Sequence, residues 1–249
     1  MPIYHVLQLT IFFHIFVATS TIRSLDQNIL EPTDLAPQQH IPESLECTTE
    51  ESVLKAVLVK LDLKTQNVRR QKGITWDGCY VTRIIFLRGK RLDGSLSSDI
   101  GKLQKLEVLD LSSTKVSGNL SSLKEATKLQ TLSLSGTKVS GELSSLKGAT
   151  KMKRLLLEGT AVSGDLASLK EATELQKLSL SGPKVSGELS SLKGATNMEW
   201  LSLEGTAVSG DLASLKEATE LQKLSLSVTK VSGELSSLKG ATKMKRLLL

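Results

Sequence analysis

From Lys105 onward the chain repeats one unit of 23 residues, and this repetition limits the possible folds more than any other feature. The best-preserved copies are Lys128–Thr150 and Glu174–Thr196. A unit this short cannot enclose a core of its own, so it must cover its apolar face with its neighbours. The repeat therefore predicts a solenoid, an architecture that mostly serves binding. A pair of leucines separated by one residue marks each copy: Leu109/Leu111, Leu132/Leu134, Leu155/Leu157, Leu178/Leu180, Leu201/Leu203, Leu224/Leu226 and Leu247/Leu249.

The N-terminus resembles a secretory leader. Residues 6–17 form a short apolar stretch, and the small residues Ala18 and Ser20 fit a cleavage site after Ser20. The stretch is too short and too interrupted by polar residues for a good membrane span. We therefore expect a signal peptide over 1–20 and a flexible leader over 21–43. A membrane anchor is the alternative.

A cap is predicted between this leader and the first repeat. Thr48 and Glu51 have capping-box spacing, which predicts that a helix begins there and continues through the amphipathic stretch 52–63. Cys47 and Cys79 flank the segment, and in a secreted chain they would form a disulfide that stabilises by roughly 2–4 kcal/mol. Two unpaired thiols are the alternative. We assign 44–80 to an N-terminal cap and 81–249 to about seven units of 23–24 residues, the last one truncated.

Each unit matches the leucine-rich-repeat pattern LxxLxLxxNxL, with Leu106, Leu109, Leu111, Thr114 and Val116 in the first full copy. The Ser-Gly-Asn-Leu that follows resembles the plant-type subclass found in receptor-like ectodomains. The Trp-Asp-Gly-Cys segment with its preceding helix resembles the N-terminal cap of that subclass. The resemblance covers about 44–249. It implies an α/β solenoid, a right-handed superhelix with a parallel sheet on the concave face and a helical N-terminal cap.

The chain departs from that family at the asparagine of the pattern, which in the family bonds backbone groups across neighbouring repeats. We expect a threonine hydroxyl to supply part of this bonding and Pro183 to supply none. Ile74 also stands where the cap usually has a second cysteine. The threonines that replace the asparagine are Thr114, Thr137, Thr160, Thr206 and Thr229.

Three columns of side chains are predicted on the concave face, because alternate residues of a strand face opposite sides of a sheet. Successive members of a column should lie about 4.8 Å apart. The first column is Val108, Thr131, Arg154, Lys177, Trp200, Lys223 and Arg246; the second is Asp110, Ser133, Leu156, Ser179, Ser202, Ser225 and Leu248; the third is Ser112, Ser135, Glu158, Ser181, Glu204 and Ser227.

An internal comparison places specificity in these columns. Segments 151–196 and 197–242 are near-copies that differ at six positions. Two differences, Arg154/Trp200 and Leu156/Ser202, lie in the predicted columns, whereas the core leucines and the Val-Ser-Gly segments, which we interpret as turns, do not change. Variation on a surface suited to binding indicates a recognition site; drift at unconstrained positions is the alternative. The predicted ligand-binding residues are Arg154, Leu156, Glu158, Lys177, Trp200, Glu204, Lys223 and Arg246.

Trp200 is the strongest single candidate for a ligand-binding residue. Leucines already fill the core positions, so we expect Trp200 to be exposed, and tryptophan and arginine are frequent interface hot spots. Lys177 and Lys223 on either side would allow cation–π contacts. A lone tryptophan covered by lysine stems is the alternative. Elsewhere we expect a solvated lysine face, a carboxylate row too sparse for calcium, and glycosylation at Asn119 in its sequon.

Several function classes are disfavoured. All three histidines precede the repeats, and no nucleotide-binding, redox or metalloenzyme motif is present, so we expect no enzyme, no metal and no cofactor. The net charge of +6 is spread along the repeats with only 3% aromatics, which disfavours nucleic-acid binding.

The chain stops at Leu249 without a polar closing unit, so we expect an incomplete sequence whose membrane association, if any, comes from a downstream segment. The sequence as a whole predicts a non-catalytic extracellular recognition module, receptor-like or secreted, that binds a protein, peptide or glycan on the concave face. A structural or adhesive surface protein without a discrete ligand is one alternative. An intracellular repeat scaffold is the other, if the leader is not processed.

Overall fold

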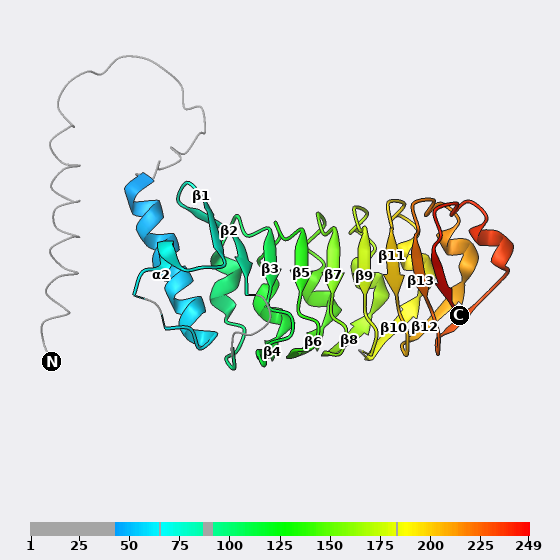
Figure 1. The fold of residues 1–249 in the computed structure, drawn as a ribbon, viewed down its shortest axis with the longest axis horizontal. Helices are drawn as coiled ribbons and strands as arrows, with labels where there is room; N and C mark the ends of the chain where they lie inside the picture. Colours follow the sequence, from blue (N-terminus) through cyan, green and yellow to red (C-terminus); the bar gives the residue numbers. More distant parts are fainter. Residues whose placement is uncertain (1–42, 65, 87–91, 183) are drawn as a thin grey trace, which may run out of the picture. The chain divides into compact units, whose positions relative to one another are not determined.

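A computed structural model describes residues 43–64, 66–86, 92–182 and 184–249 (Figure 1). The expected signal peptide and nearly all of the expected leader lie outside these residues. Within the described ranges no helix has the length and apolar character needed to cross a bilayer.

Nine strands lie side by side along the solenoid in one sheet, which is the predicted concave sheet (Figure 1). Strands β1 and β2 pair antiparallel, and all later neighbours pair parallel, which confirms the predicted parallel sheet. The strands are β1 (Ile74–Asp77), β2 (Tyr80–Ile85), β3 (Val108–Asp110), β5 (Thr131–Ser133), β7 (Arg154–Leu156), β9 (Lys177–Ser179), β11 (Trp200–Ser202), β13 (Lys223–Ser225) and β15 (Arg246–Leu248).

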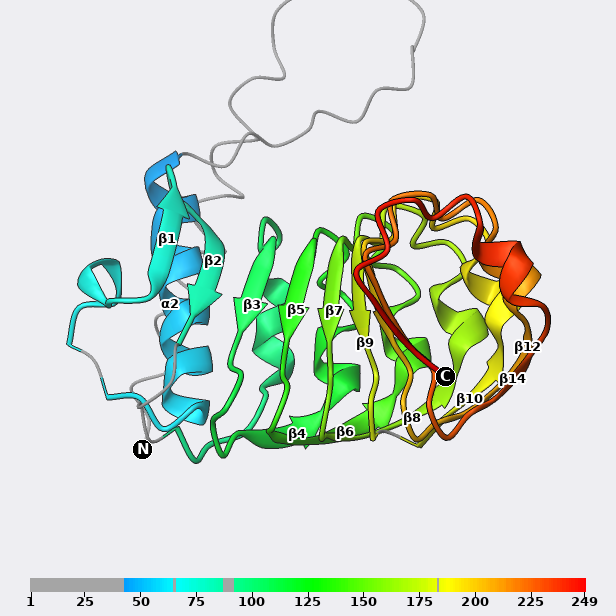
Figure 2. The ribbon, with the colours of Figure 1, turned by 45° about the vertical axis from the view of Figure 1, so that its right-hand side comes forward.

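A second, six-stranded parallel sheet runs along another side of the coils (Figure 2). It consists of β4 (Ser117–Asn119), β6 (Lys138–Glu142), β8 (Ala161–Asp165), β10 (Lys184–Glu188), β12 (Ala207–Asp211) and β14 (Lys230–Ser232). The Val-Ser-Gly segments, interpreted from sequence as turns, are therefore strands, and that interpretation was wrong. The sequence signal for these strands is the alternation of apolar and polar residues: Val139 is buried between the exposed Lys138 and the half-buried Ser140.

Short 3₁₀ helices complete the coils on the side opposite the nine-stranded sheet. They are η2 (Ser98–Lys102), η3 (Leu120–Leu123), η4 (Leu143–Leu146), η5 (Leu166–Leu169), η6 (Leu189–Leu192), η7 (Leu212–Leu215) and η8 (Leu235–Leu238), with η1 (Val68–Arg70) in the cap. The lysines that follow η3 to η8 are exposed, as predicted for a solvated face. In the described part of the chain, the α-helix of the predicted α/β class is helix α2 (Glu43–Lys60).

The leucines of successive coils form one continuous core. Leu132, Leu155, Leu178 and Leu201 are fully buried, as the alternation of the strands predicts. Phe86 and Leu92 continue this core to the cap helix, where Leu54 is fully buried. Each coil thus buries its apolar side chains only against the coils beside it.

The threonines at the asparagine position bond within their own coil and not across coils. The Thr137 hydroxyl donates to the Leu134 carbonyl at 2.6 Å and accepts the Val139 amide at 3.5 Å. Thr160 and Thr206 donate in the same way. The expected cross-repeat role is therefore wrong for threonine: its short branched side chain reaches a carbonyl of its own turn first. Pro183 lies outside the described residues.

The carboxylate row on the second sheet has local structural roles. Asp165 accepts the Ala167 amide at 2.7 Å and caps η5, whereas the longer Glu142 accepts the Ser163 hydroxyl of the next coil at 2.6 Å. Gly187, with φ +107°, lies against the Asp165 carboxylate, and a Cβ there would collide with it. Over the described ranges no three metal-ligating side chains gather at one point.

Helix α2 begins at Glu43, so the predicted start at the Thr48–Glu51 capping box was wrong. The sequence signal that was missed is the proline at position 42, because proline favours the first turn of a helix. The helix is amphipathic as predicted: Leu54, Val57 and Leu58 are fully buried, and so is Leu61 directly after its end.

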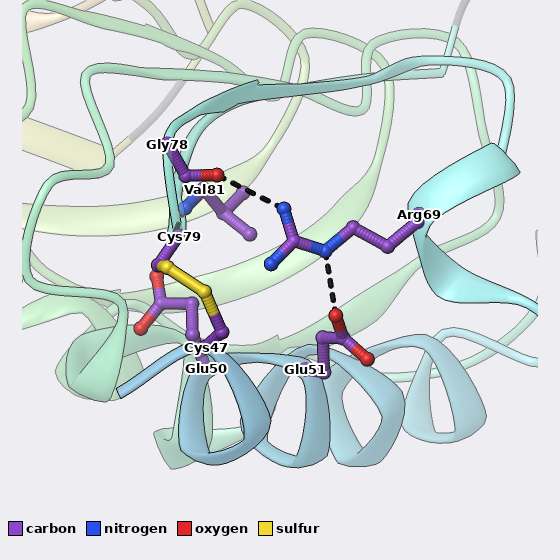
Figure 3. Close-up of a disulfide and its surroundings, with 7 residues drawn as sticks. All are labelled: Cys47, Glu50, Glu51, Arg69, Gly78, Cys79 and Val81. Atoms are coloured by element: carbon purple, nitrogen blue, oxygen red, sulfur yellow. Dashed lines mark hydrogen bonds and ion pairs between the residues drawn. A yellow bond between two sulfur atoms is a disulfide. The ribbon is translucent and has the colours of Figure 1, made fainter. Parts of the chain in front are cut away.

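A disulfide joins Cys47 of α2 to Cys79 in the turn between β1 and β2, as predicted (Figure 3). Arg69 braces the same region: its Nε donates to Glu51 Oε1 at 2.6 Å, and its Nη1 donates to the Gly78 carbonyl at 2.9 Å. The Arg69 guanidinium also lies 4.0 Å from the centre of the Trp76 ring. The cap is thus fixed to the first strands by covalent, polar and cation–π contacts.

Glu50 is a buried carboxylate beside this disulfide. It is 6% exposed and accepts the Val81 amide at 3.0 Å (Figure 3). Burial raises the pKa of Glu50, against the lowering effects of the Val81 amide and the charge of Lys105. A carboxyl with a raised folded pKa stabilises the fold below its unfolded pKa, and this contribution is lost as pH rises through the folded value.

Glu50→Gln should therefore become more stable relative to the parent protein as pH rises from the ordinary glutamate range toward neutral. The amide oxygen of glutamine still accepts the Val81 N–H, and no charge is buried. Urea unfolding at a series of pH values measures the difference. Glu125→Gln, on an exposed turn, serves as the control, and a difference that does not change with pH would contradict the prediction.

Val228 has an unfavourable backbone conformation. Its φ is +59°, and it is 83% exposed, so its side chain gains little from burial. The same position is glycine in the four preceding coils, with φ +69° at Gly136 and +71° at Gly205. A left-handed conformation costs a residue with a Cβ about 1–2 kcal/mol.

Val228→Gly should raise the free energy of unfolding by about 1 kcal/mol, the relief of strain less the greater entropy of glycine in the unfolded chain. Chemical denaturation followed by circular dichroism measures this change. The reciprocal variant Gly205→Val should lose stability, and a destabilised Val228→Gly would show that the strain argument fails.

Candidate functional site

The register of the nine-stranded sheet places the predicted columns as expected. Trp200 is paired with Lys177 on one side and Lys223 on the other, and Leu156 lies between Ser133 and Ser179. Equivalent residues of successive coils are therefore direct neighbours in the sheet. A ligand on this face would meet side chains about 4.8 Å apart along each column.

Trp200 is half-buried and not fully exposed as expected. The Lys223 ammonium lies 5.6 Å from the centre of its ring, so the predicted cation–π contact is present on this side. The indole also borders two hollows, one of about 200 Å³ and one of about 120 Å³. The ring is held by its neighbours and still presents surface to both hollows.

The larger hollow brings five of the predicted ligand-binding residues together. Its lining residues are Glu158, Ser181, Trp200, Ser202, Glu204, Lys223, Leu224, Ser225, Arg246 and Leu248. Two carboxylates, two cations, one indole and several hydroxyls thus surround one space. The smaller hollow adds Lys177, together with Glu199 and Gln222, which the sequence argument had not selected. Arg154 and Leu156 line neither hollow.

Ser202 belongs to the lining of the larger hollow, together with the half-buried Ser225 beside it. In the preceding near-copy this position is Leu156, which lines neither hollow. Ser202 is 8% exposed, so it lies at the base of the hollow. The two concave differences between the near-copies, Trp200 and Ser202, therefore meet at one hollow.

Hydroxyl groups form the base of this hollow. Ser181 and Ser202 are hydrogen-bonded through their hydroxyls at 2.7 Å, and Ser225 donates to Glu204 at 3.4 Å. In contrast, the Ser179 hydroxyl has no hydrogen-bond partner in the described part of the chain. Ser181 and Ser225 are half-buried and border the hollow, whereas Ser179, between Leu156 and Ser202, is covered.

The other predicted site residues lie away from this surface. Cys47 and Cys79 form the disulfide of the cap. Asn119 is exposed at the end of β4, and its Oδ1 accepts the Ser121 amide at 2.9 Å. Its glycosylation stays a prediction.

Comparison with known proteins gives a consistent structural result. No family model and no curated protein matches the chain by sequence. Among solved structures, PEPR1 in its complex with AtPEP1 has a TM-score of 0.69 at 29% identity, over 80% of this chain and 31% of that one. The Arabidopsis receptor kinase HAESA, in complex with the peptide hormone IDA and the co-receptor SERK1, has a TM-score of 0.57 at 27% identity, over 67% and 28%.

A plant ice-binding protein shares the fold alone, with a TM-score of 0.56 at 18% identity, over 81% of this chain and 78% of that one. The chain spans about a third of the length of the PEPR1 and HAESA chains. The structural resemblance therefore covers only a part of those two proteins.

Proposed function

We propose that this chain, a leucine-rich-repeat protein built like plant receptor ectodomains, is a non-catalytic extracellular recognition module. Its ligand is an extended peptide or a protein segment bound on the concave sheet around Trp200. PEPR1 and HAESA, which are similar in structure, were solved in complexes with AtPEP1 and with a peptide hormone. A receptor-like or secreted protein is the setting that this resemblance favours.

One observation supports the site more than any other: the concave differences between the two near-copies, Trp200 and Ser202, line the same hollow. The two positions lie two residues apart on β11 and face the same side, so the exchange changes both the anchor and the residue beside it. Here they exchange a cation for an aromatic anchor and a leucine for a small hydroxyl beside it. Aromatic residues in partly desolvated hollows commonly dominate interface energetics.

The charges of the hollow suggest how a ligand is oriented. Lys223 and Arg246 belong to the first column, whereas Glu158 and Glu204 belong to the third, four residues further along their coils. A peptide crossing the strands would place acidic side chains toward the first column and basic side chains toward the third. Such complementarity contributes to specificity and association rate more than to affinity.

The chain itself supplies the variants that test this site. Ser202→Leu copies Leu156 and should fill the hollow without disturbing the fold, and Trp200→Arg copies Arg154. Peptides selected from a displayed random library against the parent protein should lose roughly tenfold in affinity for either variant, equivalent to about 1.4 kcal/mol. Binding is measured by calorimetry or fluorescence anisotropy.

Lys184→Ala is the matched control, because Ala161 and Ala207 occupy the same position in other coils of the second sheet. This variant should bind selected peptides like the parent protein. Selected peptides that bind Ser202→Leu unchanged would exclude the hollow at Trp200 as the site. A selection that yields no binder would contradict peptide recognition.

The extracellular location has its own test. A secreted protein should begin at Thr21 and contain no free thiol from Cys47 or Cys79 after purification from culture medium, because the oxidising compartment forms the disulfide. N-terminal sequencing and thiol labelling under denaturing conditions measure these two properties. An unprocessed N-terminus with two reactive thiols would favour the intracellular scaffold.

A further inference from the structure

Another hollow, of about 280 Å³, lies where the first strands of the concave sheet begin, next to the cap. Its lining residues are Asp77, Thr82, Lys105, Glu107, Lys128, Gln130 and Lys151. None of these residues lines the hollows at Trp200, which involve later coils. It is therefore a separate surface from the proposed peptide site.

Three lysines supply the positive charges of this hollow. Lys105, Lys128 and Lys151 are exposed and occupy the first position of three successive coils. In the next three coils the same position is Glu174, Asn197 and Glu220. The ladder of cations, which we call the basic edge, is thus local to the coils beside the cap.

The lysines of the basic edge are available for a ligand. Lys128 and Lys151 have no ion pair with any carboxylate of the described residues, whereas Lys153 is paired with Glu174 at 3.8 Å and Lys243 with Glu220 at 2.6 Å. The Lys105 ammonium lies 3.8 Å from the centre of the Tyr80 ring, which holds it in place, and its charge also acts on the buried Glu50.

The spacing of the basic edge discriminates between polyanions. Neighbouring strands lie about 4.8 Å apart, whereas same-side residues of an extended peptide lie about 6.6 Å apart. An acidic peptide would therefore lose register with the lysines after one step. One pyranose unit of a linear polysaccharide is shorter than this peptide repeat and closer to one coil-to-coil step, so a chain with a carboxylate on every sugar offers its charges at a spacing nearer to that of the lysines.

The other lining residues favour a sugar over a polymer that carries charge alone. Asp77, Glu107, Thr82 and Gln130 provide oxygens that accept hydrogen bonds from hydroxyl groups. The same two carboxylates repel every polyanion, so the preference for a sugar depends on its hydroxyl groups. A nucleic acid would also need stacking aromatics, and none of the residues that line this hollow is aromatic.

We propose that the basic edge binds a linear acidic polysaccharide with one carboxylate per sugar. The lysines bind successive carboxylates, and the acidic and amide side chains between them bind hydroxyl groups. Attraction between exposed charges is screened by salt, so binding weakens as ionic strength rises. The surface would hold the module on a polyuronate while the hollow at Trp200 remains free.

The test uses oligogalacturonate long enough to span the three coils as the probe. The variant Lys128→Glu with Lys151→Glu copies the glutamate that Glu174 supplies at this position, so it should fold. Its affinity should fall at least about tenfold, because two weak attractions become repulsions. Lys193→Glu with Lys239→Glu, on the exposed turns at the opposite side, makes the same change in net charge and should leave affinity nearly unchanged.

Other probes separate the ligand classes, and each is titrated at low and high salt. Fully methyl-esterified oligogalacturonate, which has the same backbone without charge, should not bind. If polyglutamate bound as tightly as oligogalacturonate, the ligand would be an acidic peptide and the proposal would be wrong. If a single-stranded polynucleotide did so, the ligand would be a nucleic acid and the proposal would also be wrong. If both double variants lost affinity equally, the binding would depend on net charge alone and the proposal would be wrong. Ser202→Leu should bind the probe like the parent protein.

Discussion

The burial of each coil's leucines against the next coil is the interaction on which the rest of the structure depends. Leu155, Leu178 and Leu201 are fully buried although no single coil surrounds them. Removing one coil would expose the faces of both neighbours, so the stability of the solenoid is a sum over contacts between neighbours. This constraint leaves the outward positions of the strands free to vary, and both proposed binding surfaces are built from such positions.

The two surfaces are made by small departures from a strict repeat. Trp200 and Ser202 line one hollow where the preceding near-copy has Arg154 and Leu156, and a run of lysines at the first position of three coils makes the basic edge. At each of these positions another coil has a residue of different character; Leu156, for example, is the counterpart of Ser202. The scaffold remains the same because these positions do not contact the leucine core.

Much of the fold could be predicted from sequence because period, alternation and register are linked in a repeat. Once Leu201 and Leu203 face the core, Trp200 and Ser202 must face outward, and the parallel pairing fixes Lys177 and Lys223 as neighbours. The second sheet was missed because three or four residues of alternation around Val139 resemble a turn. The helix start was missed because the capping-box spacing at Thr48 competes with the signal of a proline at position 42.

The sequence by itself determined the solenoid and the identity of its columns, because both follow from spacing along the chain. It also predicted the pairing of Cys47 with Cys79, because these two cysteines flank the cap in a chain with a secretory leader. Only the tertiary structure decided which column members share a hollow, how far Trp200 is buried and where the threonine hydroxyls bond. These properties depend on side-chain volume and reach across neighbouring coils. A leucine and a serine at one position obey the same repeat, yet only the packed coils show that Ser202 lines the hollow at Trp200 and that Leu156 does not.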